Sequence, residues 1–324
     1  MQLNRRRGCL GGLTSRIVIS SLLTALLSGS AFAQTGSELE RGGEESGRWK
    51  PPTHLRAQFQ LQGVSDHCKT GGYNARVHGK AFDGSWVSPE AYFIDLYADD
   101  GACPQYAPGT PNRDAVRAVH AAGKKAICYV DIGSAEPYRP DYQEFVDFDK
   151  RCSGCLLGKT YDSGDPFLSL NNRKGERTFV LAEMEKRLDK CAAAGFDGVY
   201  FDVTWEWQVG KDVTGWNISY ETQLLYNVAM LNMAHMHNLA AGINYDLLQI
   251  KDLVAQEDFH IDESCFDYNE CDYLLPVTKA GKPVLQIEYF ADPASVCSQQ
   301  PKPYDFNTEF KNQDLFDHPW STCR

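Results

Sequence analysis

The sequence predicts a single domain built as a closed (β/α)8 barrel. Short apolar runs rich in β-favouring residues alternate with stretches of helical periodicity, which is typical of a parallel sheet. Eight such strands fit in the roughly 270 residues that follow the N-terminal segment, a usual length for this barrel. An open doubly wound sheet is the alternative, and we disfavour it because no glycine-rich phosphate-binding loop follows the first strand. Ala-Gly pairs recur, each expected between a helix and a strand, at 122–123, 194–195, 241–242 and 280–281.

The first 33 residues have the pattern of a secretory signal peptide. Arg5 to Arg7 form a basic start, an apolar run follows, and Ala31-Phe32-Ala33 is a small-residue cleavage pattern. A membrane anchor is the alternative, and the absence of a stop-transfer pattern argues against it. Residues 34–50 are polar and rich in Gly, Glu and Ser, which predicts a flexible lead-in. We therefore expect a secreted monomer, free of the membrane once the signal is removed, whose domain covers 51–324.

The net charge limits which kinds of molecule the protein is expected to bind. The chain carries −11 at pH 7, and the signal segment holds four arginines and no acid, so its removal leaves −15. A strongly acidic chain argues against nucleic acid and favours a neutral or cationic partner, although such charge also serves solubility alone.

The cysteines predict disulfides, because ten of the eleven follow the signal segment of a chain expected to be secreted. Cys152 and Cys155 form a CxxC motif, but its position in a loop argues against a redox role. Cys128 in a predicted strand and Cys191 in a predicted helix are candidates for buried free thiols. The full connectivity stays open. The plausible pairs are Cys68–Cys103, Cys265–Cys271 and Cys297–Cys323, the last of which would tie down the C-terminal tail.

The first half of the domain opens with a short strand at 59–63 and a long loop. A second strand at 91–96 precedes a helix that Thr110-Pro111 would start, with an N-cap residue before proline. The third strand, 126–131, is apolar almost throughout, as expected when both faces of a sheet are covered. Another long loop leads to a weaker fourth strand at 166–170.

The second half begins with a helix over 176–194 that ends at Gly195, where glycine accepts the left-handed conformation. A fifth strand at 199–201 follows, and Ser219 is expected to cap a helix that runs to Ala241-Gly242. The remaining predicted elements are a sixth strand at 243–244, a helix over 247–255, a seventh strand at 259–263, a helix over 270–280 and an eighth strand at 283–289.

Polar residues end six of the predicted strands. In a barrel, the C-terminal ends of the strands meet in one mouth, where active sites form. Crowded carboxylates raise the pKa of some members, so that one carboxyl group stays protonated while its neighbour stays ionised. Glycoside hydrolysis needs such a pair of carboxyl groups. The six residues are Asp95, Asp131, Asp202, Asn244, Glu263 and Glu288.

Four segments resemble glycoside hydrolase family 114, the endo-α-1,4-polygalactosaminidases, over nearly all of residues 49–290. They read IDLY at 94–97, ICYVDIGSAEPYRPD at 127–141, RLDKCAAAGFDGVYFD at 187–202 and DFHIDESCFDYNEC at 258–271. The resemblance implies a (β/α)8 barrel and a galactosamine-containing polysaccharide as substrate. It also implies a catalytic pair at the end of the fifth strand and at the Glu shortly before the Cys that follows the seventh. Asp202 and Glu263 match these two positions.

The chain departs from the family pattern at two places in the predicted mouth. After GFDGV the family has Asp-Pro-Asp-Asn-Val-Asp, and here Tyr200 and Trp205 replace the two flanking acids, while Asp202 is kept. The family's Lys-Asn pair on the sixth strand reads Ile243-Asn244. These departures motivate two alternatives to the implied activity, namely a carbohydrate-binding relative without turnover and a hydrolase of another α-linked glycan.

We assign Glu263 as the general acid and Asp202 as the nucleophile or base. Trp205, Trp207 and Tyr138 are candidate sugar-stacking platforms, with lid packing as the alternative. We expect Glu206 to be solvated. No cofactor or metal is expected, because the eight histidines lack metal-ligand spacing. The predicted substrate-binding residues are Asp95, Asp131, Glu136, Tyr138, Arg139, Trp205, Asn244 and Glu288, with a loop ion pair as the alternative role of Arg139.

Overall fold

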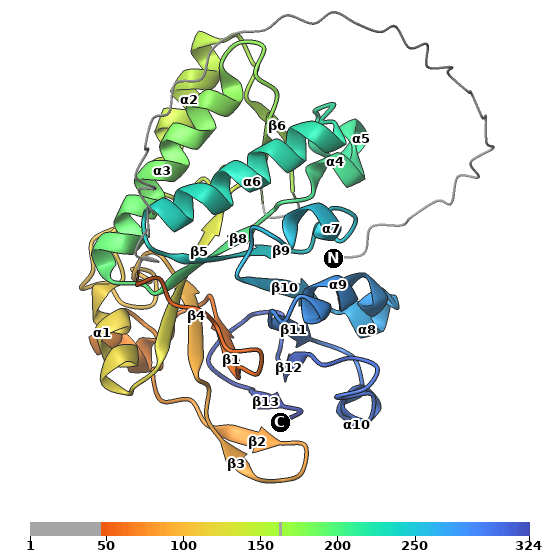
Figure 1. The fold of residues 1–324 in the computed structure, drawn as a ribbon. Helices are drawn as coiled ribbons and strands as arrows, with labels where there is room; N and C mark the ends of the chain where they lie inside the picture. The colour runs from red at the N-terminus through yellow and green to blue at the C-terminus, as the bar shows by residue number, and fades with distance from the viewer. Residues whose placement is uncertain (1–46, 162–163) are drawn as a thin grey trace, which may run out of the picture. The chain divides into compact units, whose positions relative to one another are not determined.

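The computed structural model describes residues 47–161 and 164–324 (Figure 1). The predicted signal peptide and the first part of the lead-in, through residue 46, lie outside the described residues. Across the described ranges, no helix combines the length and the apolar character that a membrane span requires.

Eight parallel strands form the frame of the fold in the described part of the chain, which confirms the predicted barrel class. We call the edge where their C-terminal ends meet the mouth. In sheet order they are β1 (Ala57–Gln60), β4 (Ala91–Asp95), β5 (Lys125–Asp131), β8 (Gly198–Asp202), β9 (Ala240–Asn244), β10 (Phe259–Glu263), β11 (Val284–Glu288) and β12 (Asn307–Phe310).

Side chains and a loop join the first and last of these strands. No strand pairing between β12 and β1 is found among the described residues. Instead, the N–H group of Phe59 donates to Glu309 Oε1 at 3.1 Å, and Trp320 Nε1 donates to the carbonyl of Ala57 at 2.9 Å. The Leu61 N–H group donates to the carbonyl of Leu315 at 3.0 Å. Beyond β12, the sheet continues through β13 (Ser321–Thr322), β2 (Gly79–Ala81) and β3 (Trp86–Val87).

Alternate residues of the strands point to opposite sides of the sheet, as pleating requires. The inward set packs as an aromatic core, in which Phe59 and Phe93 stack at 4.1 Å and Phe259 meets Phe93 edge-on at 5.8 Å. This core forms a floor below the mouth.

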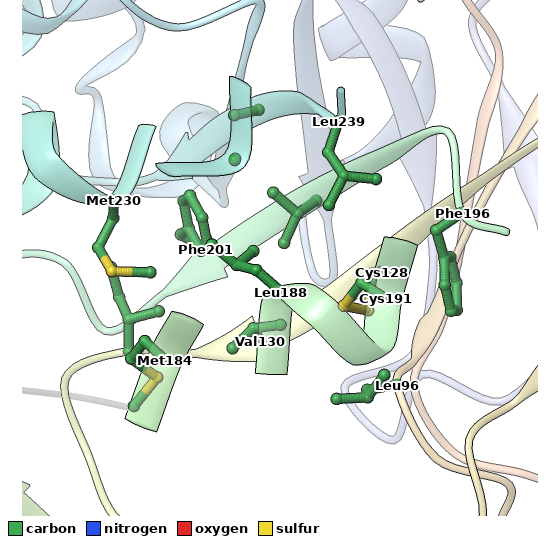
Figure 2. Close-up of a cluster of buried hydrophobic side chains, with 14 of the residues drawn as sticks. Leu96, Cys128, Val130, Met184, Leu188, Cys191, Phe196, Phe201, Met230 and Leu239 are labelled. Carbon is green, nitrogen blue, oxygen red and sulfur yellow. A yellow bond between two sulfur atoms is a disulfide. The ribbon is translucent and has the colours of Figure 1, made fainter. Parts of the chain in front are cut away.

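The outward set packs under the helices that separate the strands (Figures 1 and 2). Val130 and Phe201 lie among Met184 and Leu188 of α3 and Met230 of α6 in this layer. The helices are α1 (Arg113–Ala121), α2 (Tyr142–Arg151), α3 (Glu176–Ala194), α4 (Glu206–Val209), α5 (Lys211–Thr214), α6 (Tyr220–Met236), α7 (Ile250–Leu253), α8 (Cys265–Tyr268), α9 (Leu275–Lys279), α10 (Pro293–Cys297) and the 3-10 helices η1 (Ser65–Thr70) and η2 (Cys271–Leu274).

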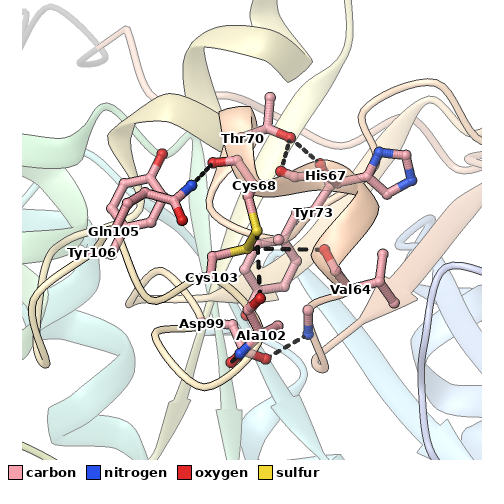
Figure 3. Close-up of a disulfide and its surroundings, with 12 residues drawn as sticks. Val64, His67, Cys68, Thr70, Tyr73, Asp99, Ala102, Cys103, Gln105 and Tyr106 are labelled. Atoms are coloured by element: carbon pink, nitrogen blue, oxygen red, sulfur yellow. Dashed lines mark hydrogen bonds between the residues drawn. A yellow bond between two sulfur atoms is a disulfide. The ribbon is translucent and has the colours of Figure 1, made fainter.

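Ten cysteines form five disulfides in the described residues. The expectation of free thiols is wrong, because Cys128 points outward from β5 onto Cys191 of α3, and the two are bonded (Figure 2). Cys68–Cys103 joins the loops after β1 and β4 beside the mouth (Figure 3). Cys265–Cys271 and Cys297–Cys323 are also bonded, so all three pairs predicted from the sequence are confirmed. The fifth disulfide of the described residues joins Cys152 to Cys155.

One predicted barrel strand is wrong, and another was not predicted. The segment predicted as the fourth strand contains β7 (Pro166–Leu168), which pairs antiparallel with β6 (Leu157–Thr160) outside the main sheet. Its buried Phe167 and Leu168 give it the same apolar pattern as a barrel strand. The eighth position belongs to β12, whose inward residue is the polar Glu309 and which therefore lacks that pattern.

Several boundaries also differ from the predictions. Helix α1 has Asn112, not Thr110, at its N-cap. Helix α6 is capped by Ser219 as predicted but ends at Met236, so Ala241-Gly242 lies inside β9. Glycine is required there by packing, because a Cβ on Gly242 would lie 2.2 Å from the Phe259 ring. The first strand begins two residues before the predicted 59–63, and the predicted helices over 247–255 and 270–280 reduce to α7 and to η2 followed by α9.

Candidate active site

A row of five hydrogen-bonded side chains crosses five neighbouring strands at the mouth, and we call it the carboxylate row. Tyr129 of β5 donates to Asp202 Oδ2 of β8 at 3.1 Å. Asn244 Nδ2 of β9 donates both to Asp202 Oδ1 at 2.9 Å and to Glu263 Oε1 of β10 at 3.0 Å. Tyr289, directly after β11, donates to Glu263 Oε2 at 2.7 Å. The row is symmetric, with an amide at its centre and a tyrosine hydroxyl beyond each carboxylate.

The shared amide fixes the spacing of the two carboxylates. Because both hydrogen bonds start from Asn244 Nδ2, the two accepting oxygens lie no farther apart than the sum of the two distances, 5.9 Å. Pairs of catalytic carboxylates lie about 5–5.5 Å apart in retaining glycosidases and about 6.5–9.5 Å apart in inverting ones. These ranges refer to whole carboxyl groups, whereas the bound joins their two nearest oxygens, so the bound is compatible with both classes.

The two carboxylates differ in what sets their protonation. Burial raises the pKa of Asp202, while hydrogen bonds from Asn244, the Val203 N–H group and Tyr129 oppose the shift. Burial and the charge of Asp202 together raise the pKa of Glu263, against hydrogen bonds from Tyr289 and Asn244. Both side chains are partly exposed at the mouth, so solvent reaches them. The pKa of both carboxylates is therefore raised, and the charge of the partner carboxylate is a main cause for Glu263 but not for Asp202.

The backbone turns sharply after each of the three central side chains. Val203, Tyr245 and Ser264 follow Asp202, Asn244 and Glu263, and their φ angles are +54°, +63° and +65°. Such values are uncommon for residues other than glycine and least common for a β-branched one. In the first of these turns the Val203 N–H group also donates to Asp202 Oδ1 at 2.8 Å. Strained backbone of this kind concentrates at functional sites.

Four predicted substrate-binding residues lie just beside the row but are committed to internal contacts. Arg139, only 8% exposed, donates to Asp95 Oδ1 at 2.7 Å and to Glu136 Oε2 at 2.6 Å. Burial works to raise the pKa of Glu136, but the guanidinium of Arg139 outweighs it and holds the pKa below its usual value. Asp131 accepts from the N–H groups of Gly133 and Ser134 at 2.9 and 2.8 Å. These residues form a buried scaffold under the loop after β5.

The three candidate aromatic platforms differ in their exposure to solvent and in their contacts. Tyr138 is 71% exposed, with its ring centroid 5.1 Å from the Arg139 guanidinium carbon. Trp205 is partly exposed and meets the ring of Tyr245 edge-on at 6.1 Å. Trp207 donates its indole N–H to Asp246 at 2.9 Å and belongs to the packing of the core. Tyr138 and Trp205 are therefore available at the mouth, whereas Trp207 is not.

Two acids lie elsewhere than the sequence suggests. Glu288 was expected in the mouth, but it alternates with the inward Ile287 and Tyr289 and faces outward, where it accepts from the Phe266 N–H group at 3.0 Å. Burial raises its pKa to about 7. Glu206 was expected to be solvated and is fully buried, which raises its pKa well above the usual value.

Tyrosine hydroxyls are the functional groups that sequence reasoning missed. Tyr129 was not singled out, although counting back two residues from Asp131 places it on the same inward face. Tyr200 was seen only as a lost acid, and its hydroxyl lies 3.5 Å from Glu263 Oε1. Within the described ranges, no group of three or more His, Cys, Asp or Glu residues is arranged to hold a metal ion.

The fold is similar to that of solved glycosidase structures. Ega3 of Aspergillus fumigatus, solved in complex with galactosamine, is 24% identical with a TM-score of 0.63, over 85% of this chain and 97% of that one. More distant is a GH27 β-L-arabinopyranosidase of Geobacillus stearothermophilus, 11% identical with a TM-score of 0.45, over 72% of this chain and 60% of that one. An α-galactosidase of Thermus thermophilus is 13% identical with a TM-score of 0.39, over 60% and 39% of the two chains.

No curated protein matches the chain. The model of glycoside-hydrolase family GH114, in contrast, matches residues 41–324, which include every strand of the barrel and the whole carboxylate row. This chain therefore belongs to glycoside-hydrolase family GH114 and is a glycoside hydrolase.

Proposed function

We propose that this protein is a secreted hydrolase that cleaves α-1,4-linked, galactosamine-containing polysaccharide, with Asp202 and Glu263 as its catalytic pair. The observation that carries the proposal is the Asn244 amide, which donates to both carboxylates and holds them side by side at the mouth. Membership in GH114 and the galactosamine bound by Ega3 support the substrate class. Five disulfides and the secretory leader pattern support an extracellular location.

We take a double displacement with retention of configuration as the mechanism. Two carboxylates that accept from one amide lie side by side, as the nucleophile and the acid of a retaining enzyme do. Asp202 is the better nucleophile, because its donors stabilise the ionised form and the charge of Glu263 is not among the main causes that raise its pKa. Glu263 is the better acid, because burial and the adjacent negative charge favour its protonated form.

In the first step, the Glu263 proton passes to the glycosidic oxygen while an Asp202 oxygen attacks the anomeric carbon. The glycosidic bond breaks, one part of the chain leaves with a new hydroxyl group, and the other is held as an ester of Asp202. In the second step, ionised Glu263 takes a proton from water, and the resulting hydroxyl displaces Asp202 from the anomeric carbon. Both carboxyl groups return to their starting protonation states.

The acidic net charge suits the proposed substrate, because a partly deacetylated galactosamine polymer is cationic and the chain without its signal segment carries −15. Tyr200 and Trp205, which replace acids of the family pattern, leave the Asp202–Asn244–Glu263 contacts intact. The geometry therefore favours turnover over binding alone.

Product release from purified protein on α-1,4-galactosaminogalactan tests the proposal. Wild type should release oligosaccharides, whereas Glu263→Gln should release none in the same time. The matched control is Glu288→Gln, a change of the same size and charge on the outward face, which should keep wild-type activity. NMR of the first product should show the α configuration at its new reducing end. Binding without any product from wild type would move the protein to the carbohydrate-binding class, and a β product would exclude the double displacement.

A further inference from the structure

Two exposed aromatic rings stand at the rim of the mouth. Phe290 is 74% exposed and Tyr138 is 71% exposed, the highest values among aromatic side chains in the described part of the chain. Phe290 lies in the loop after β11, and Tyr138 lies in the loop after β5. Single exposed apolar residues are common on protein surfaces, so their position has to carry the argument.

Their position relative to the carboxylate row is specific, because the two rings flank its opposite ends. Phe290 directly follows Tyr289, with ring centroids 6.5 Å apart, and the Tyr289 hydroxyl contacts Glu263. At the other end, the Arg139 guanidinium carbon lies 5.1 Å from the ring of Tyr138 and 5.9 Å from the ring of Tyr129. The Tyr129 hydroxyl in turn contacts Asp202.

The ring of Tyr138 is held in place from beneath. Its hydroxyl donates to Glu136, and Glu136 is bonded to the buried Arg139, which lies against the ring. This support keeps the side chain ordered while most of its surface stays open to solvent. A ring ordered in advance binds a ligand at a lower cost in conformational entropy. Glu136 and Arg139 can therefore contribute to substrate binding while they stay buried, because they hold the Tyr138 ring in place.

We propose that Tyr138 and Phe290 are stacking platforms for sugar units on either side of the bond that is cleaved. The polysaccharide chain then runs across the mouth from the loop after β5 to the loop after β11, with the scissile bond over Asp202 and Glu263. Aromatic rings suit this task, because they offer a large, rigid, apolar surface to the C–H faces of sugar rings. The inference rests on the proposed function for the identity of the glycan.

Calorimetric titration with purified α-1,4-linked galactosamine oligomers of increasing length tests the platforms. All variants carry Glu263→Gln, so that no ligand is cleaved during the titration. Phe290→Ala and Tyr138→Ala should each weaken the binding of long oligomers by about tenfold, which corresponds to about 1.4 kcal/mol. The shortest oligomers should bind almost as before, because they do not reach the rim. Tyr138→Phe keeps the ring and should keep most of the affinity.

The matched control is Phe82→Ala, which removes an aromatic side chain of 54% exposure from the turn between β2 and β3. That hairpin leads into the amino end of β4, the end opposite the mouth. The platforms are excluded if the rim variants bind long oligomers as tightly as the control does, or if no oligomer binds. Cleavage by wild type is measured in parallel, so the two proposals fail separately. If wild type cleaves the polymer but the Tyr138 and Phe290 variants bind long oligomers normally, only the proposal of stacking platforms is wrong. If the variants lose affinity for long oligomers but wild type cleaves nothing, only the proposal of a hydrolase is wrong.

Discussion

Two sets of acids lie near the C-terminal ends of the barrel strands and face opposite ways. Glu263 faces the mouth, where Asn244 and Tyr289 donate to it and solvent reaches it. Its neighbour Asp262 faces outward and is 1% exposed. Burial raises the pKa of both, and that of Asp262 well above its usual value. A raised pKa therefore does not identify a catalytic acid. Solvent access and a paired carboxylate within reach distinguish the inward set.

The largest expected effect comes from removing the inward nucleophile. Asp202→Ala should lower kcat by about a thousandfold or more, because no group then attacks the anomeric carbon. Added azide should restore part of the rate by attacking from the same side, with a β-glycosyl azide as the product. The same azide should do nothing for Glu263→Gln on the unactivated polymer.

The outward neighbour sharpens this result. Asp262→Asn should keep kcat within about threefold of wild type, because its side chain does not reach the mouth. Equal losses from Asp202→Ala and Asp262→Asn, in proteins that circular dichroism shows to be folded, would remove the distinction between the two faces.

The second-largest loss of activity should come from replacing Asn244 at the centre of the carboxylate row. Asn244→Ala removes the one group that donates to both carboxylates. We expect kcat to fall by about a hundredfold, as when a preorganised donor is removed from an active site. Steady-state kinetics on the polymer measures it, with the melting temperature as the control for folding. A loss smaller than about threefold would mean that the spacing of the pair does not depend on the amide.

The outward acids should affect stability rather than rate. Burial raises the pKa of Glu288 to about 7 in the folded protein, above the ~4.3 of an unfolded chain. Its ionised form is therefore disfavoured by folding, and this cost grows as the pH rises from about 4 to 7. Glu288→Gln should raise the free energy of unfolding by about 3.5 kcal/mol at pH 8 and by almost nothing at pH 4. Urea unfolding at the two pH values measures the difference, and equal effects at both would contradict the assignment.

The smallest expected effects are shifts of the pH profile of activity, which differ between the two ends of the carboxylate row. Activity needs Asp202 ionised and Glu263 protonated, so it is lost as the pH falls through the first pKa and as it rises through the second. Tyr129 lowers the pKa of Asp202, so Tyr129→Phe should raise it and move the acid limb to higher pH. Tyr289 lowers the pKa of Glu263, so Tyr289→Phe should move the alkaline limb to higher pH.

We expect each of these shifts to be roughly half to one pH unit, the size of one hydrogen bond. The profile of kcat/KM against pH measures them, and each variant is the control for the other. If Tyr129→Phe moved the alkaline limb and Tyr289→Phe moved the acid limb, the assignment of acid and nucleophile would be reversed.

Much of the fold could be predicted from the sequence, because seven of the eight barrel strands carry apolar residues on their inward face. The eighth, β12, could not, since Glu309 stands at its inward position and Lys311 follows it. The β7 segment was wrongly predicted as a barrel strand because it is apolar although it lies outside the main sheet. Its Phe167 and Leu168 are as buried as those of a barrel strand, but they serve a hairpin.

The site was predicted as a set of strand-end residues, and the structure brings Asp202, Asn244 and Glu263 into contact. Their catalytic roles stay predictions. Glu288 was misplaced because a strand end was taken as sufficient, whereas inward and outward positions alternate. The left-handed conformations at Val203, Tyr245 and Ser264 had no signal, because none of the three is a glycine.

The junction between β12 and β1 has a consequence for biosynthesis. The groups that meet β1 there belong to Glu309, Leu315 and Trp320, all within the last sixteen residues of the sequence. A growing chain therefore cannot complete this fold until residues 309–320 have left the ribosome or the translocation channel. Contacts between such distant parts of a chain form late and slowly. The nascent protein must keep its first strand available until that segment has emerged.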